Sequence, residues 1–432
     1  MSIDRAERLS GLNKYFATSI GVYMNYFVHG MQAIVIAQNK NAFAAQWGTD
    51  AAGIMSVIAW TGLGKFLTVW ISGELSDRFG RKPLILLGML SYILFFAGLV
   101  TCHNLVLASI LAFLGGAATS FLDGASYPAL QESYPNSPGS AVVAVKGFIS
   151  VSQMLFPLFI GMLVVNKAWF GWSLIVPLVI VVINTLFMLR APFSYDSELK
   201  ENKSGSGSAY EERKAAKAKA EAEAAALAEK RFVTRPKFAV EGICCLIYGF
   251  VSLTTFYLIS QVLTMYGKDY IGMAEMSSRA LMTYYTFGSL AAVFLASVVM
   301  AKGLKTIAVL LIYTCGSTIS LFALAAIPTP FVANITSFTI GFFAAGGALQ
   351  AGIAIMTEFF PGKKGRNLGI YYTFMGLGSY VAPVVASYLM KIDFKYVLYF
   401  DAFVALAGIL LMSIVAVRYT KVFGKKIFSL KD

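Results

Sequence analysis

The absence of charge over residues 84–122 constrains the fold of this chain more than any other feature. That stretch contains no Asp, Glu, Lys or Arg. A helix that crosses a bilayer needs about 20 apolar residues, so the stretch is long enough for two. Across all 432 residues, 13% are charged and 58% hydrophobic, whereas soluble domains carry about 25% charged residues. The composition therefore predicts an integral membrane protein.

Similar apolar windows recur along the whole sequence and predict twelve transmembrane helices. Aromatic residues such as Trp169 and Tyr396 crowd several of the window ends, as expected at membrane interfaces. The expected fold class is an all-α integral membrane protein. The first six helices are expected to begin near residues 15, 50, 84, 105, 140 and 169, and the second six near 238, 277, 304, 331, 367 and 396.

Basic residues gather in alternate loops, and this pattern predicts the orientation. They are dense in the N-terminal tail, 78–82, the central linker, 302–305, 363–366 and the C-terminal tail. Because such loops stay in the cytoplasm, we expect a multi-pass protein of the cytoplasmic membrane with both termini cytoplasmic. The first residues lack the pattern of a cleaved signal peptide. The net charge of +13 is explained by loops near anionic lipid and not by nucleic-acid binding, since the basic residues are scattered.

A polar stretch divides the chain into two halves. It contains "SGSGS", a flexible linker, and then an Ala-rich run with interspersed Glu and Lys that predicts a surface helix. We interpret this helix as a spacer, with a regulatory or membrane-surface role as the alternative. The expected organisation is an N-terminal six-helix bundle over residues 1–190, a cytoplasmic linker over 191–236 and a C-terminal six-helix bundle over 237–432.

The two halves also align with each other. At a constant offset of 226, Glu132 meets Glu358, and the same register matches Pro135 with Pro361, Gly139 with Gly365 and Pro157 with Pro383. An acid, two prolines and a glycine in one register indicate a duplication. Internal repeats of this kind are typical of secondary transporters.

The charged stretch "GELSDRFGRKP", residues 73–83, resembles the loop signature of the major facilitator superfamily, G-x-L-x-D-R-x-G-R-K. The resemblance implies two pseudo-symmetric six-helix bundles that rock in alternating access, with this loop as a conformational latch. Arg81 is expected to pair with Glu132. The equivalent loop of the second half, "MAKGLKT", lacks the acid, so Glu358 and Arg366 are the candidates there. The expected latch residues are Gly73, Asp77, Arg78, Gly80, Arg81, Glu132, Glu358 and Arg366.

Five ionisable residues within or near the predicted spans need a reason to be there, because charge in a bilayer is costly. On the first helix, His29 shares a face with Asn25 and Gln32. We expect that face to line a cavity, with hydrogen-bonded packing as the alternative. His29 is a candidate for substrate binding or proton transfer, although a lone histidine is often only hydrogen-bonded.

The other four ionisable residues are Lys65, Asp123, Lys146 and Glu241. Lys65 either acts in the site or snorkels to the cytoplasmic interface. Asp123 shares a face with Tyr127, and Lys146 with Gln153. Asp123 and Lys146 are expected at similar depth, as a structural ion pair or as a pair that substrate or proton can break. Glu241 is expected to be interfacial, and the second half to offer neutral groups, among them Tyr248, Gln350 and Tyr372.

The charge balance of the first half, two lysines and a histidine against one aspartate, favours an anionic substrate. The sequence therefore predicts a monomeric secondary transporter for a small organic anion, such as a hydroxylated carboxylate, driven by protons. The alternatives are a neutral sugar or polyol symporter, a multidrug–proton antiporter and a transporter-like nutrient sensor. Antiport is disfavoured because the fourth helix carries Asp123 where R-x-x-x-G is common. No enzymatic activity, cofactor or metal site is expected, since neither a Walker loop nor a histidine cluster is present.

Overall fold

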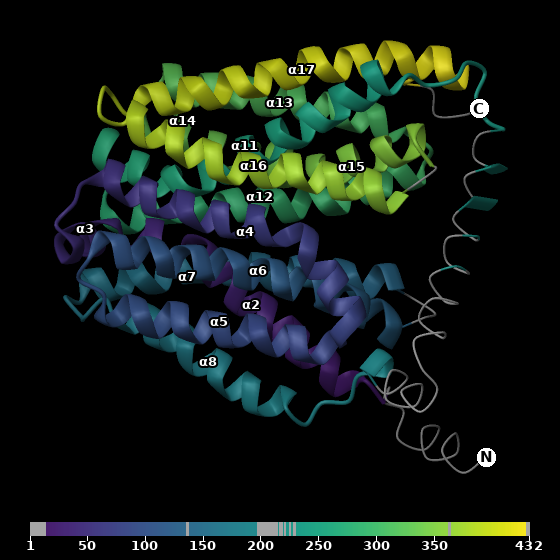
Figure 1. Ribbon diagram of the computed structural model, residues 1–432. Helices are drawn as coiled ribbons and strands as arrows, with labels where there is room; N and C mark the ends of the chain where they lie inside the picture. The colour runs from purple at the N-terminus through teal and green to yellow at the C-terminus, as the bar shows by residue number, and fades with distance from the viewer. Residues whose placement is uncertain are drawn as a thin grey trace.

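The computed structural model describes residues 14–134, 138–196, 230–361 and 364–428, with isolated positions between 215 and 227. All regular elements in these ranges are helices (Figure 1). The surface helix expected in the linker falls mostly outside the described residues. Pro135 of the repeat and the side chain of Arg366 lie outside them as well.

The helices of the first half lie together, drawn in purple to teal in Figure 1. A short helix, α3, interrupts the sequence of long ones directly after the first span. In chain order they are α2 (Phe16–Gln38), α3 (Lys40–Trp47), α4 (Ala51–Phe79), α5 (Arg81–Thr101), α6 (Leu105–Ser133), α7 (Pro138–Val165) and α8 (Trp172–Met188).

The helices of the second half, drawn in green to yellow, lie beside them. Three π-helical turns extend or interrupt its helices. In chain order the elements are η2 (Phe238–Gly242), α11 (Ile243–Met265), η3 (Tyr266–Tyr270), α12 (Glu275–Ala301), α13 (Thr306–Ala326), α14 (Pro330–Ile340), η4 (Gly341–Ala345), α15 (Ala348–Phe359), α16 (Lys364–Leu389) and α17 (Lys395–Phe423).

The predicted spans match these helices closely. Within the described ranges, ten helical segments are long and apolar enough to cross a membrane, counting η2–α11–η3 and α14–η4–α15 as one segment each. The shorter α8 and the less apolar α16 complete the set of twelve. Each predicted start lies within three residues of a helix start. The apolar windows therefore predicted the helix positions well. In lipid, the backbone of an apolar segment can form hydrogen bonds only within the segment, so the segment becomes a helix.

Glycines bring α4 and α6 into close contact. A Cβ on Gly116 would lie 1.9 Å from the Thr61 carbonyl oxygen, and a Cβ on Gly64 would lie 2.0 Å from that of Phe113. Small residues are the usual means by which helices in membranes approach closely. The Ser120 hydroxyl then donates a hydrogen bond to the Lys65 carbonyl across the contact, at 3.0 Å. This packing turns the middle of α4 toward α6.

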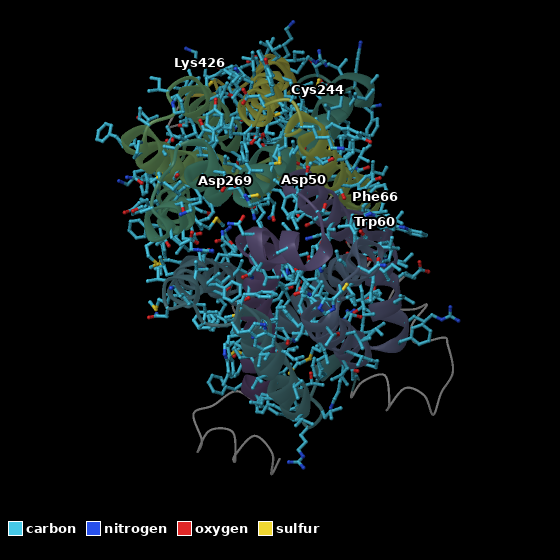
Figure 2. All side chains as sticks on the ribbon, turned by 90° about the vertical axis from the view of Figure 1, so that its left-hand side faces the viewer. Asp50, Trp60, Phe66, Cys244, Asp269 and Lys426 are labelled. Atoms are coloured by element: carbon cyan, nitrogen blue, oxygen red, sulfur yellow. The ribbon has the colours of Figure 1, made fainter. Side chains whose placement is uncertain are left out.

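The two halves are joined at the end of the molecule where α3 lies. Arg279 of α12 donates from Nη1 to the carbonyl and side-chain oxygens of Gln38, at 3.0 and 2.9 Å. The Gln38 amide donates to Thr264 at 2.9 Å, and Lys40 pairs with Asp269. Figure 2 views the molecule from this end, where Asp269 is labelled.

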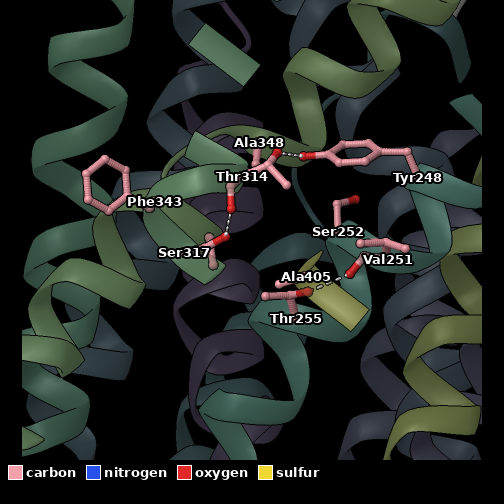
Figure 3. A pocket seen from close by; sticks show the side chains of 10 residues that line it. Tyr248, Val251, Ser252, Thr255, Thr314, Ser317, Phe343, Ala348 and Ala405 are labelled. Carbon is pink, nitrogen blue, oxygen red and sulfur yellow. Dashed lines mark hydrogen bonds between the residues drawn. The ribbon is translucent and has the colours of Figure 1, made fainter. Parts of the chain in front are cut away.

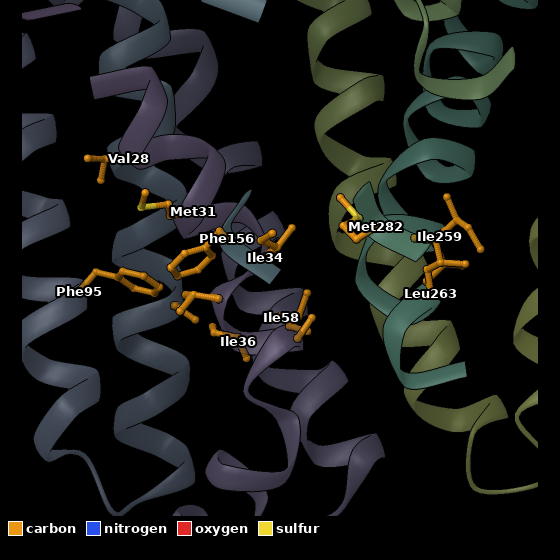
Figure 4. Close-up of a cluster of buried hydrophobic side chains, with 14 of the residues drawn as sticks. Val28, Met31, Ile34, Ile36, Ile58, Phe95, Phe156, Ile259, Leu263 and Met282 are labelled. Carbon is orange, nitrogen blue, oxygen red and sulfur yellow. The ribbon is translucent and has the colours of Figure 1, made fainter. Parts of the chain in front are cut away.

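An apolar cluster continues these contacts inward. It contains Ile34 and Ile58 from the first half and Ile259, Leu263 and Met282 from the second (Figure 4). All five side chains are almost completely buried. The α3 end is therefore closed by both polar and apolar contacts between the halves.

Candidate functional site

An ion pair between α4 and α6 lies at the centre of the candidate site. The Lys65 Nζ atom is 3.3 Å from Asp123 Oδ2, and the two side chains are 35% and 25% exposed. The Tyr26 hydroxyl of α2 donates to Asp123 Oδ1 at 3.0 Å. Both oxygens of the carboxylate are thus engaged, one by a cation and one by a neutral donor.

The sequence suggested Lys146 as the partner of Asp123, and the structure corrects this. Glycine-mediated packing brings α4 against α6, so Lys65 takes that place. Lys146 lies on α7, partly exposed, and forms no ion pair with any side chain that the structure describes. Gln153, on the same helix, is also partly exposed. The lysine expected to be compensated is therefore the uncompensated one.

His29 is held by neutral hydroxyl groups. Its Nδ1 atom is 2.8 Å from the Tyr92 hydroxyl, which lies 3.0 Å from the Thr119 hydroxyl. Tyr92 and Thr119 are buried, whereas His29 is partly exposed. The His29 ring also meets the Tyr26 ring edge-on, with centroids 6.1 Å apart. His29 therefore adjoins the Lys65–Asp123 pair through Tyr26.

The other two residues of the predicted first-helix face lie in packing contacts. Asn25 is fully buried and accepts a hydrogen bond from Asn184 of α8 at 2.7 Å. Gln32 is buried beside α6, where its Nε2 atom would lie 3.0 Å from a Cβ on Gly115. The structure therefore brings His29 to the ion pair but places Asn25 and Gln32 between helices.

Two tyrosines border the ion pair. The Tyr127 ring lies 5.5 Å from the Tyr26 ring, centroid to centroid. Tyr372 of α16 is 41% exposed, and the Asp123 carboxylate is close enough to interact electrostatically with both Tyr127 and Tyr372. Tyr372 thus brings the second half of the chain to the site.

A small pocket within the second half has hydroxyl-bearing walls (Figure 3). The Tyr248 hydroxyl lies 3.0 Å from that of Thr314, and Ser252, Thr255 and Ser317 contribute the other hydroxyls. The pocket adjoins the break between η4 and α15, where Gly347 has φ = 117°. Gln350 is exposed and does not line it.

Two acids of the second half are fully buried within the protein. Glu241, expected at the interface, is fully buried, and it accepts hydrogen bonds from Arg418 Nε at 2.6 Å and from the Lys237 amide at 2.9 Å. Asp401 was missed. It is fully buried, and neither of its carboxyl oxygens has a hydrogen-bond partner. The signal was available, because Asp401 is the only charged residue in 396–417.

The latch loop forms a compact charged network at the junction of α4 and α5. Arg81 is 6% exposed, and its guanidinium lies 2.8 Å from Glu132 Oε1 and 2.5 Å from Asp77 Oδ1. The Arg81–Glu132 pair suggested by the sequence is therefore present. Gly80 has φ = 104°, a conformation that favours glycine.

Residues that follow α8 contact this network. The sequence alone did not predict these contacts. The Arg81 guanidinium lies 4.3 Å from the Tyr195 ring centroid, and the Tyr195 hydroxyl donates to the Asp77 carbonyl at 2.7 Å. Asp196 accepts hydrogen bonds from the amides of Arg81 and Lys82, at 3.0 and 3.2 Å. Burial raises the pKa of the Asp196 carboxyl, and these hydrogen bonds partly offset the rise. The segment expected to be a cytoplasmic linker thus begins with residues that belong to the latch network.

The remaining latch candidates lie apart from this network. A Cβ on Gly73 would contact nothing within 4 Å, and Arg78 is exposed above the Phe79 ring. In the second half, Glu358 accepts a hydrogen bond from the Tyr419 hydroxyl at 2.7 Å. The side chain of its proposed partner, Arg366, lies outside the described residues.

Comparisons with known proteins agree on a family. The model described as Major Facilitator Superfamily matches residues 18–348 and 271–426. The chain is 36% identical to "Inner membrane transport protein YdiM" of Escherichia coli K12, over 95% of this chain and 96% of that protein. It is 34% identical to "Inner membrane transport protein YdiN" of the same organism, over 95% and 93%.

A solved structure gives the same fold. It is titled "Inward open conformation of the xylose transporter XylE from E. coli" and superposes with a TM-score of 0.71, covering 93% of this chain and 95% of that one. The sequence identity is 12%, so this likeness concerns the fold alone.

Proposed function

The chain belongs to the major facilitator superfamily of secondary transporters, and we propose that its substrate is a small organic anion carried together with protons. A hydroxylated carboxylate fits best. Family members are transporters and not enzymes, so the side chains described above bind and release a solute without changing it. The relatives named as inner membrane proteins support a place in the cytoplasmic membrane.

The uncompensated charge of Lys146 carries this proposal. Lys65 and Asp123 neutralise each other, with 3.3 Å between charged atoms. Lys146 has no acidic partner among the described side chains, so the first half keeps an excess of positive charge. A cation in surroundings of low dielectric constant attracts an anion more strongly than it does in water. We assign to Lys146 the role of binding the substrate carboxylate.

The groups around the Lys65–Asp123 pair suit the remainder of such a substrate. Tyr127 and Tyr372 can exchange hydrogen bonds with substrate hydroxyl groups, since a phenol is both donor and acceptor. The Lys65–Asp123 pair can open when a proton or the substrate competes for one partner. His29, partly exposed beside it, is a second candidate for carrying a proton.

The transport cycle follows from the two-bundle fold. In this family the halves rock about a site near the bilayer midplane. We infer that contacts at the α3 end and the Arg81–Glu132 network at the other end alternate in stability as they rock. We further infer that both termini are cytoplasmic, because the basic loops of the first and second halves then lie on the same side. We also infer that the transporter acts as a monomer.

A thermal-shift screen tests the substrate class. Purified protein in detergent is heated with hydroxylated carboxylates, neutral polyols or lipophilic cations. A ligand at about 100 times its Kd should add roughly 2.7 kcal/mol of stability. We expect a carboxylate to stabilise the wild type and Lys146→Arg but not Lys146→Ala.

One observation favours the polyol alternative. The Lys65–Asp123 pair is neutral overall and adjoins several tyrosine hydroxyls, which suits an uncharged sugar or polyol. Stabilisation by polyols alone, unchanged in Lys146→Ala, would replace the anion with a neutral substrate. Stabilisation by cations alone would point to antiport.

A further inference from the structure

Asp401 is the most unusual side chain of the second half. It lies on α17, six residues after the first residue of that helix, and it is 0% exposed. Neither Oδ1 nor Oδ2 has a hydrogen-bond partner in the described part of the chain. By contrast, Glu241 forms an ion pair with Arg418, and Asp123 forms one with Lys65.

The two helices that pack most extensively on α17 offer no positive charge to compensate Asp401. Neither α11 nor α13 contains a charged residue, and their titratable groups are tyrosines and cysteines. From α12, the buried Tyr285 interacts electrostatically with Asp401, but its hydroxyl donates to the Phe256 carbonyl at 2.8 Å.

Other charged residues of α17 and its neighbours lie far from Asp401 or are already paired. Along α17, Lys395 is about 9 Å away and Arg418 about 26 Å away at 1.5 Å per residue. Lys395 pairs with Asp393, and Arg418 pairs with Glu241 of η2. The tyrosines of α16 are Tyr371, Tyr372, Tyr380 and Tyr388, and none of them hydrogen-bonds to Asp401.

This environment determines the charge of the carboxyl group. An ionised carboxylate that is buried without a partner is so costly that the group takes up a proton instead. A bound metal cation is disfavoured, because Na⁺ or Ca²⁺ would require several oxygen ligands and no other polar atom hydrogen-bonds to this carboxyl. A proton requires only the carboxyl group itself.

Asp401 lies one helical turn from a residue that lines the hydroxyl-bearing pocket. Ala405, one helical turn further along the same face of α17, lines the pocket with Thr255 and Ser317. We propose that Asp401 is a proton-binding site inside the C-terminal half, with the pocket hydroxyls as its route of exchange. The proton leaves the carboxylic acid for a pocket hydroxyl or water and returns by the same route, so no further reactant is required.

The position of the site suggests how it acts in transport. The pocket adjoins the break between η4 and α15, so gain or loss of the proton changes the charge beside a discontinuous span. Discontinuous helices are where transporters of several folds couple ions to movement. This coupling role rests on the proton-driven transport proposed above, whereas proton binding by Asp401 does not.

Infrared spectroscopy of the purified full-length protein tests proton binding without any substrate. We expect the carbonyl band of a protonated carboxylic acid at pH 7 in the wild type. The band should disappear in Asp401→Asn, whose amide is the nearest neutral isostere. It should persist in the control Asp393→Asn, two residues before the start of α17. Absence of the band from the wild type at pH 7, or its survival in Asp401→Asn, overturns the proposal.

A flux measurement tests the coupling. Proteoliposomes are loaded with the carboxylate that gives the largest thermal shift in the screen above. Asp401→Asn should exchange this carboxylate at the wild-type rate but lose at least tenfold in accumulation driven by a pH gradient. Unchanged accumulation overturns the coupling role. If no carboxylate stabilises the protein, the substrate assignment fails, while the infrared result still decides whether Asp401 binds a proton.

Discussion

At the scale of single residues, the site depends on which charges are paired. Lys65 and Asp123 satisfy each other, Glu241 is paired with Arg418, and Lys146 and Asp401 are left without a counter-charge in the described structure. A pair of partly exposed charges contributes little net stability, but an isolated charge left behind by mutation is costly. We therefore expect the paired charges to contribute mainly to stability, and Lys146 and Asp401 mainly to function.

The Lys65–Asp123 pair provides a stability test. We expect Asp123→Ala to lower the free energy of unfolding by about 1–2 kcal/mol, because Lys65 loses its partner at a site that is only partly exposed. Lys65→Met should cost a similar amount. The double variant should lose less than the sum of the two, as thermal unfolding in a double-mutant cycle will measure. Strictly additive losses would mean that the pair does not interact.

The sequence revealed less at this scale than at the others. It identified Lys65, Asp123 and Lys146 as charges within the membrane spans but not which lysine meets the aspartate. That choice depends on the close approach of α4 and α6, which periodicity cannot measure. Asp401 was overlooked because it follows Tyr399 and Phe400, a pattern that resembles a membrane interface.

At the scale of helices, the first half depends on the glycine contact between α4 and α6. Gly116→Val would place side-chain atoms where the Thr61 carbonyl lies, 1.9 Å from a Cβ. Overpacking of this kind costs about 1–3 kcal/mol. We expect a lower thermal unfolding temperature and weaker Lys65–Asp123 coupling in the double-mutant cycle. Gly147→Val on α7, where a Cβ would contact nothing within 4 Å, is the control. Equal losses in both variants would contradict the role of the contact.

Helix positions were well predicted, and the latch was predicted in part. Twenty-residue apolar windows identify transmembrane helices because the backbone N–H and C=O groups in lipid can hydrogen-bond only within the helix. The loop signature indicated Arg81 and Glu132. It gave no sign of Tyr195 and Asp196, because their contacts cross 114 or more sequence positions and depend on where α8 ends.

At the scale of the whole molecule, the contacts at the α3 end hold the halves in one arrangement. Arg279→Ala removes the two hydrogen bonds to Gln38 and leaves its buried carbonyl without that donor. A loss of about 1–2 kcal/mol corresponds to a factor of 5–30 in population. We therefore expect amide hydrogen exchange over residues 261–283 to accelerate by a similar factor. Lys395→Ala, which removes a charge paired within the second half, should leave that exchange unchanged. No acceleration in Arg279→Ala would show that other contacts close this end.

The Lys40–Asp269 contact links the turnover of this transporter to its surroundings. Asp269 is 36% exposed, so dissolved ions reach the pair and screen it over a Debye length of about 8 Å at physiological salt. Every cycle that opens the α3 end separates these two charges. The opening step should therefore quicken as salinity rises on that side of the membrane, while the buried Gln38–Arg279 contact sets a barrier that salt does not lower.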